Sequence, residues 1–259
     1  MESVVAICKE VLKRLSEMDY ERKGGSSVQR LIFPNKFPSE KEGKTYSDQE
    51  LLNYTRISEQ ELRFLFVEEF LREPNNGYYY SVETPTKEKY KFGKTNDDIK
   101  IDASGRSASI DMCIFKKCNE NKYHRLLNIE FKNANASQKS ISKDILKLMH
   151  EEENGAFVLL LKNTNSGTLN NLADKRDGVI DKLIASIKYH QNEQNVWNGA
   201  ERKSIELIIL SLEEKENKTE LPFIMHRTII KSEIKTLVNR QDNWKREYLK
   251  DGLFQVRVL

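Results

Sequence analysis

Four segments of the chain carry apolar residues at the spacing of an α-helix. Apolar positions that recur every three or four residues form one stripe along a helix, and that stripe is the side that packs against a core. The second segment also has a start signal, because Ser58 is followed three residues later by Glu61, which is the pattern of a capping box. The predicted helices cover residues 3–18, 58–72, 140–152 and 176–190.

A second set of segments has the pattern of β-strands. Residues 156–161 and 205–212 are continuous apolar runs, which are typical of strands buried on both faces. Residues 86–105 read as a polar loop, with a short strand at 90–92 as the alternative for part of it. Helices interposed between strands predict a mixed α/β fold, in which helices flank a central sheet on both faces. The predicted strands are 78–84, 107–115, 126–132, 156–161 and 205–212.

The pattern divides the chain into a core and two flanks. Residues 1–56 hold one helix and an irregular connection, so we expect an N-terminal extension. Residues 57–212 hold most of the predicted elements and form the expected α/β core. Residues 213–259 begin with a polar loop and continue without a clear pattern, as a C-terminal extension packed on the same domain. At 259 residues, 38% apolar and 32% charged, the chain is long enough for one large domain with such appendages.

Composition argues against several classes of protein. No run of 18 apolar residues is present, so we expect no membrane span. The first residues lack the basic and apolar regions of a secretory signal. Three cysteines are too few for a disulfide scaffold and favour a reducing compartment, so we expect a cytoplasmic location. The net charge of +3 is too balanced to argue for nucleic-acid binding by itself, so any such function must come from a site.

Charged side chains interrupt two of the predicted strands. Asp111 lies in one, and Glu130 and Lys132 lie in the next, where alternation places them on the same face. Burial of an unpaired charge is costly, so these residues need partners. A surface ion pair at a strand end is one explanation. A metal site is the other, because two carboxylates from neighbouring strands suit Mg²⁺ and an adjacent lysine can orient water and stabilise negative charge.

The spacing of these residues resembles a known signature. Asp111, eighteen intervening residues and then Glu130-Phe131-Lys132 are similar to the motif of the PD-(D/E)XK nuclease superfamily, although Ile110 stands where many members have proline. The predicted order helix-strand-strand-strand-helix-strand over 58–161 also resembles the core of this restriction-endonuclease-like fold. The resemblance implies that Asp111 and Glu130 hold Mg²⁺, for which Mn²⁺ can substitute. It also implies that Lys132 assists the attacking water.

The superfamily often adds a glutamate from the first core helix. Glu59 falls on the apolar stripe of the predicted helix, one turn before Leu62, and would face the sheet. Glu61 already has a role in the capping box, so Glu59 is our first candidate and Glu61 the second; the alternative is that neither touches the metal. Glu83, at the end of a predicted strand, is either a partner for Lys132 or an exposed end residue.

Basic and polar residues near the predicted site are candidates for nucleic-acid contacts. Gln138 and Lys143 belong to the helix after the Glu130 strand, which lies near bound phosphates in the fold that the chain resembles. Lys89 and Lys91 lie in a basic segment with aromatic residues, which would suit a phosphate backbone. The alternative for both groups is a solvated surface, to which we also assign Asp144.

The resemblance implies a Mg²⁺-dependent endonuclease that hydrolyses phosphodiester bonds, with DNA favoured over RNA as its partner. Restriction, repair or defence in a bacterium or phage is the implied role, and a homodimer or a larger defence or repair complex is the candidate assembly. The alternative is a catalytically silent nuclease-like module that binds nucleic acid or another protein. A small-molecule α/β enzyme is a third interpretation. For this third interpretation the sequence offers no motif. It has neither a P-loop, which binds phosphate, nor the histidine spacing of a zinc site.

Overall fold

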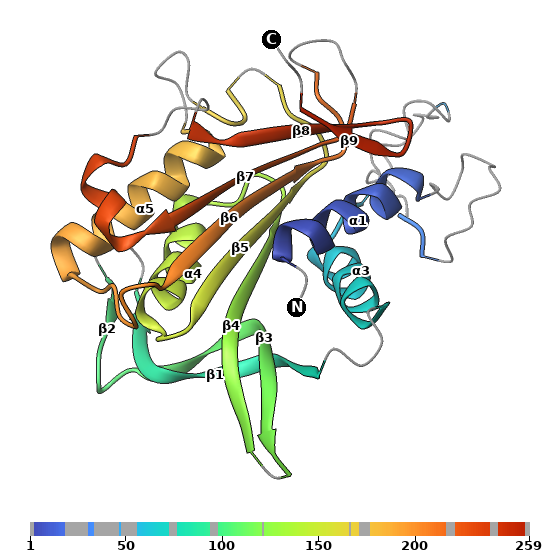
Figure 1. Cartoon of the computed structure of the whole chain (residues 1–259). Helices are drawn as coiled ribbons and strands as arrows, with labels where there is room; N and C mark the ends of the chain where they lie inside the picture. The colour runs from blue at the N-terminus through green and yellow to red at the C-terminus, as the bar shows by residue number, and fades with distance from the viewer. Residues whose placement is uncertain are drawn as a thin grey trace, which may run out of the picture.

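The computed structural model describes residues 3–18, 31–33, 47, 56–72, 77–93, 98–120, 122–165, 167–170, 177–215, 221–238 and 243–256. Over these residues nine strands form one sheet, in the order β2-β1-β3-β4-β5-β6-β7-β8-β9 (Figure 1). The pairs β4–β5 and β5–β6 are parallel and the other pairs are antiparallel. The predicted mixed α/β architecture, a mixed sheet flanked by helices, is therefore confirmed.

The elements have the following bounds. The strands are β1 (Tyr78–Phe92), β2 (Ile99–Ile101), β3 (Arg106–Asn119), β4 (Lys122–Asn133), β5 (Asn154–Leu161), β6 (Ser204–Ser211), β7 (Phe223–Ile230), β8 (Lys245–Lys250) and β9 (Leu253–Gln255). The helices are α1 (Val4–Glu17), α3 (Glu59–Arg72), α4 (Gln138–His150) and α5 (Val179–Gln194), and η1 (Lys231–Thr236) is a 3₁₀ helix.

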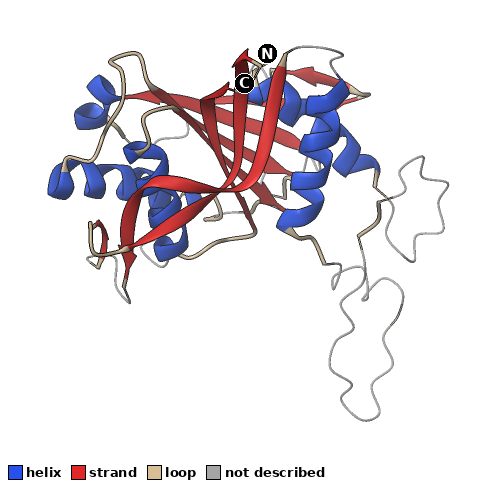
Figure 2. Ribbon diagram, turned by 90° about the horizontal axis from the view of Figure 1, so that it is seen from below, coloured by secondary structure: helices blue, strands red, loops and turns tan. Residues whose placement is uncertain are grey.

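Helices cover both faces of the sheet, as Figure 2 shows from below. On one face α4 and α5 pack against the sheet, and on the other face α1 and α3 do so. Alternate side chains of β5 serve the two cores: Phe157 and Leu159 contact the α4–α5 side, and Val158 and Leu160 contact the α1–α3 side. This double burial explains why the sequence of β5 is a continuous apolar run.

Helix α3 forms as its sequence predicts. The Ser58 amide donates a hydrogen bond of 2.7 Å to Glu61 Oε2, which is half of the expected capping box. The apolar stripe of the helix is buried against β4 and α1, and the ring of Phe66 packs edge-on against Phe131 with 5.4 Å between centroids. This packing fixes the start of α3, and therefore Glu59, beside the end of β4.

One expectation from the sequence is wrong, and one segment holds strands that the sequence does not predict. Residues 86–92 belong to β1 and not to a loop, because β1 continues through Pro85 to Phe92. At Pro85 the strand still pairs with β3, and the register shifts between Pro85 and Lys89, an irregularity of the kind that accommodates a proline in a strand. The C-terminal segment, for which no clear element is predicted, adds β7, β8 and β9 to the same sheet.

Candidate active site

Asp111, Glu130 and Lys132 lie on neighbouring strands where the pairing of β3 and β4 ends. The last pair of this ladder is Met112 with Ile129, so Asp111 lies one residue beyond the end of the pairing. Asp111 Oδ2 instead accepts a hydrogen bond of 2.8 Å from the Phe131 amide. One carboxylate oxygen of Asp111 therefore bridges the two strands, and the other faces the side chains of α3.

Helix α3 contributes Glu59 and Arg63 to this site. Arg63 Nη2 lies 2.6 Å from Asp111 Oδ1 and 2.6 Å from Glu59 Oε1. Arg63 Nη1 lies 3.0 Å from Oε1 of Glu83, which is exposed on β1. The guanidinium thus holds three carboxylates from three different elements. Glu83 partners Arg63 and not Lys132.

Helix α4 contributes Asp144 and Lys147. Lys132 Nζ lies 2.8 Å from Asp144 Oδ2 and 3.9 Å from Glu59 Oε2. Lys147 Nζ lies 2.6 Å from Glu130 Oε1 and 3.0 Å from Asp144 Oδ1. Asp144 therefore links the two lysines, and the contacts join β3, β4, α3 and α4 into one charged network.

We call this network the acid–base cluster. Its carboxyl groups outnumber its cations by two, since five carboxyl groups face three cations. In a partly buried site such an excess is offset either by a bound cation or by protonation of a carboxyl group. The members are Glu59, Glu83, Asp111, Glu130 and Asp144 with Arg63, Lys132 and Lys147.

Burial shifts the pKa values of several members. Glu130 is fully buried, and its pKa is well above the ordinary value because burial and the Asp144 carboxylate outweigh the attraction of Lys147. Burial also raises the pKa of Glu59, against the opposing effect of Lys132. Burial alone would lower the pKa of Lys132, but Asp144 and Glu59 outweigh it and raise the pKa, so this lysine is charged at neutral pH.

The donor set fits a hard divalent cation in part. Mg²⁺ commonly takes one or two protein carboxylates and keeps several waters, and Asp111 and Glu130 are such a pair. Glu130 Oε2 is buried and has no hydrogen-bond partner among the described residues. Arg63 and Lys147, however, occupy the other carboxylate oxygens. Within the described part of the chain, no group of three or more His, Cys, Asp or Glu residues is arranged to hold a metal ion.

The two candidate glutamates of α3 have different surroundings. Glu59 Oε1 contacts Arg63 and Oε2 lies near Lys132, so Glu59 belongs to the acid–base cluster. Glu61 is buried and accepts the hydrogen bond from the Ser58 amide. The structure therefore brings Glu59, and not Glu61, together with Lys132.

The candidate nucleic-acid contacts lie outside the cluster. Gln138 Nε2 donates to a backbone carbonyl of α5 at 3.1 Å and to Ser186 Oγ at 2.7 Å, so it ties two helices together. Lys143 Nζ lies 5.2 Å from the centroid of an aromatic ring of β1. Lys91 pairs with Asp102 at 2.7 Å, and Lys89 is exposed on β1.

Sequence reasoning missed Arg63, Asp144 and Lys147. The assignment of Asp144 to a solvated surface is wrong, because Asp144 is 6% exposed and Lys147 is 7% exposed. A signal was present: Glu59 and Arg63 are four residues apart, and Asp144 and Lys147 are three apart, so each pair shares a helix face. Both helices flank the strands that carry the predicted site.

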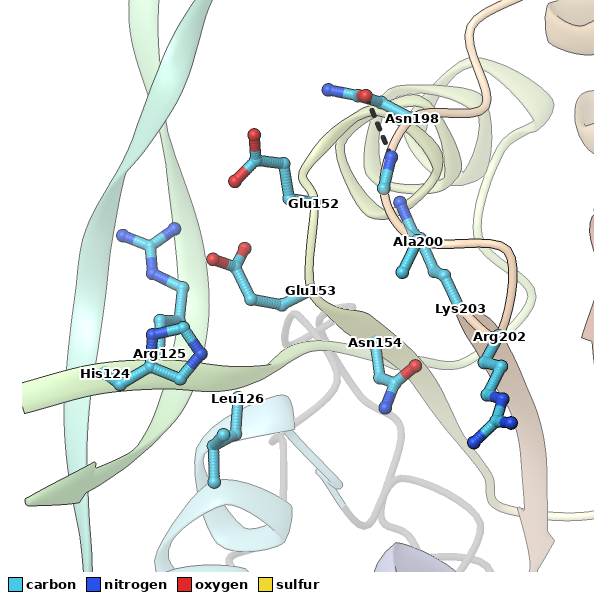
Figure 3. A pocket seen from close by; sticks show the side chains of 11 residues that line it. His124, Arg125, Leu126, Glu152, Glu153, Asn154, Asn198, Ala200, Arg202 and Lys203 are labelled. Atoms are coloured by element: carbon cyan, nitrogen blue, oxygen red, sulfur yellow. Dashed lines mark hydrogen bonds between the residues drawn. The ribbon is translucent and has the colours of Figure 1, made fainter. Parts of the chain in front are cut away.

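A hollow of about 610 Å³ lies elsewhere on the protein, and no member of the acid–base cluster lines it. It lies between His124 and Arg125 of β4 and the segment that ends at Lys203 (Figure 3). Burial lowers the pKa of Lys203 to about 7, and its Nζ donates to the Met149 carbonyl at 2.7 Å. The two glutamates at its edge, Glu152 and Glu153, pair with a lysine of β1 at 2.9 and 2.6 Å. Lys203 and these two glutamates are therefore already paired within the chain.

No protein-family model, curated protein or solved structure matches this chain. Fold and site therefore define its class in physical terms, as a mixed α/β protein with a partly buried cluster of carboxylates and cations. Among the described helices, none is both long and apolar enough to cross a membrane.

Proposed function

We propose that this chain is a Mg²⁺-dependent nuclease that hydrolyses phosphodiester bonds, with DNA as the favoured substrate. The observation that carries the proposal is the acid–base cluster, in which Asp111, Glu130 and Lys132 belong to one network of contacts. The order α3, β1, β3, β4, α4, β5 supports a restriction-endonuclease-like core, to which β2 is a three-residue addition.

Each residue has a role that follows from its position. Asp111 and Glu130 would hold the metal, which when bound polarises a phosphoryl oxygen and lowers the pKa of water. Lys132, charged and 2.8 Å from Asp144, would stabilise the negative charge that develops on the phosphate. Glu59, whose pKa burial raises, is suited to accept a proton from the attacking water.

One observation favours the alternative of a catalytically silent module. Arg63 and Lys147 already provide positive charge to Asp111 and Glu130. In that alternative the cluster is a structural ion-pair network that joins α3 and α4 to the sheet. The two functions differ in their need for metal, and this difference makes them separable by experiment.

A cleavage assay tests the proposed function. Purified protein is incubated with plasmid, linear duplex, single-stranded DNA and RNA, in Mg²⁺, Mn²⁺ or EDTA. We expect cutting that EDTA abolishes and that Lys132→Ala reduces by at least about 100-fold, the typical cost of losing one group that stabilises transition-state charge. Lys250→Ala, on β8 and outside the cluster, is the matched control and should cut like the wild type. A folded wild-type protein that cuts none of the four substrates would favour the silent module.

A further inference from the structure

An exposed group of aromatic side chains lies where β1, β3 and β4 extend past the cluster. Tyr79, Tyr80 and Tyr123 are 43%, 40% and 47% exposed. Together with Phe115 they line a hollow of about 310 Å³. The rings of Tyr79 and Tyr123 meet edge to face, with 4.9 Å between centroids. The Tyr80 ring instead packs against Phe70 of α3, with 6.0 Å between centroids. We therefore call Tyr79, Phe115 and Tyr123 the aromatic patch. Exposed aromatic surface gathered in one hollow is typical of a binding site.

Positive charge surrounds the aromatic patch. Strands β3 and β4 project beyond the rest of the sheet as a hairpin (Figure 1). This hairpin carries Lys116, Lys117 and Lys122, all exposed and without an ion-pair partner among the described residues. The Arg125 guanidinium lies 5.9 Å from the centroid of the Phe115 ring, but it is paired with Glu151 at 3.2 Å, so the free positive charge comes from the lysines. The hairpin has only Glu120 as a carboxylate within its described residues 115–120 and 122–125.

We propose that the aromatic patch binds unpaired bases of a single-stranded nucleic acid. Bases stack on exposed aromatic rings without regard to sequence, and nearby lysines contact the phosphates. The hollow offers ring faces, and the hairpin offers a local excess of positive charge. Base-paired nucleic acid hides its ring faces inside the stack, so the patch favours an unpaired strand over a duplex.

The position of the patch connects it to the acid–base cluster. Tyr79 and Glu83 both lie on β1, four residues apart, so their Cα atoms are separated by at most about 14 Å. Val82, which lies between the patch and the cluster, is exposed, and so is Glu83 at the margin of the cluster. A strand bound at the patch would therefore pass along β1 toward Asp111. This last step rests on the proposed nuclease function, whereas binding at the patch does not.

A binding measurement in EDTA tests the inference. Fluorescence anisotropy is measured with a labelled oligothymidine of about 12 nucleotides and with a duplex of equal length. We expect tighter binding of the single strand, and a Kd raised at least about 5-fold by Tyr79→Ala or Tyr123→Ala, since stacking contributes at least about 1 kcal/mol per base. Tyr123→Phe keeps the ring and should bind like the wild type. Phe64→Ala removes an exposed ring of α3 outside the patch and is the matched control.

Thermal unfolding of each variant separates loss of binding from loss of fold. Equal affinity of the wild type and the folded tyrosine variants would overturn the inference, as would tighter binding of the duplex. Because EDTA removes metal ions, the result is independent of cleavage. A wild-type protein that binds through the patch and cuts nothing would sustain this inference and contradict the nuclease.

Discussion

At the scale of single residues, Arg63 controls how negative the acid–base cluster is. Its guanidinium contacts Glu59, Glu83 and Asp111 at 2.6 to 3.0 Å. Arginine keeps its proton at all physiological pH values, so this charge cannot be titrated away. A divalent metal at Asp111 must therefore compete with Arg63 or share the carboxylate with it.

Removal of this charge should strengthen metal binding. A unit charge at about 4 Å interacts by about 1 kcal/mol even at the dielectric constant of water, so Arg63→Met should tighten Mn²⁺ binding by about 5-fold or more. Isothermal titration calorimetry measures the affinity. Arg72→Met, at the other end of α3 and outside the cluster, should leave it unchanged. Weaker binding by Arg63→Met would mean that Arg63 organises the carboxylates for the metal.

The sequence predicts the site residues that lie within apolar strands. Asp111, Glu130 and Lys132 are visible because charges are unexpected within apolar strands. Lys147 is not visible in this way, because charged residues are common on helices and the sequence does not show which partner the side chain contacts. Its 2.6 Å contact with Glu130 depends on how α4 lies across the sheet, which periodicity alone does not give.

At the scale of elements, α4 connects the acid–base cluster to α5. Asp144 and Lys147 lie on one face of α4, and Ser142 lies on another. Ser142 Oγ is 2.9 Å from His190 Nε2 of α5. Burial lowers the pKa of His190 to about 4, so its imidazole is neutral in the folded protein at neutral pH. The position of the cluster therefore depends on a buried polar contact between two helices.

The lowered pKa of His190 makes the stability of the protein depend on pH. An unfolded histidine has a pKa of about 6.5, so on acidification the unfolded state takes up a proton before the folded state does. The stability that this residue contributes is present above about pH 6.5 and declines as the pH falls toward 4, by up to about 3 kcal/mol.

Urea unfolding at several pH values between about 7.5 and 4.5 measures this decline. His190→Asn should lose stability less steeply on acidification than the wild type. His124→Asn, at an exposed histidine, should follow the wild type. Parallel curves for the wild type and His190→Asn would contradict the role assigned to burial.

Elements differ in how far the sequence predicts them. The four helices are confirmed because each has a clear apolar stripe, and α3 also has its capping signal. Strand β1 is longer than predicted because Pro85 looks like a strand end, and the register shift that follows it is not visible in the sequence. Strands β8 and β9 are short, with six and three residues, and β9 at the edge of the sheet has no buried residue, so their sequences carry little pattern.

At the scale of the whole molecule, the chain ends belong to the same core as the predicted site. Leu12 and Val11 of α1 are fully buried in the cluster of side chains that also contains Ile208 of β6 and Ile224 of β7. Phe66 of α3 lies in this core as well. The N-terminal helix and the C-terminal strands therefore stabilise the elements that hold the acid–base cluster.

Leu12→Ala should destabilise the whole protein. Truncation of a fully buried leucine typically costs about 2 to 5 kcal/mol, through lost burial and the cavity that remains. Trp197 and Trp244 lie in the core on the opposite face of the sheet and report unfolding by fluorescence. Their urea transition should shift together with the transition of helical circular dichroism. An unchanged tryptophan transition in Leu12→Ala would mean that α1 unfolds independently.

Metal binding by the acid–base cluster separates the nuclease from the silent module. Calorimetric titration with Mn²⁺ tests it directly, in the wild type, Asp111→Asn, Glu130→Gln and the control Glu233→Gln on η1. We predict one ion per wild-type chain, unchanged affinity in the control and a loss of at least about 10-fold in each cluster variant, since loss of a mere outer partner of a metal already costs this much. No binding by folded wild-type protein, or equal binding by all four, would contradict metal binding by the cluster.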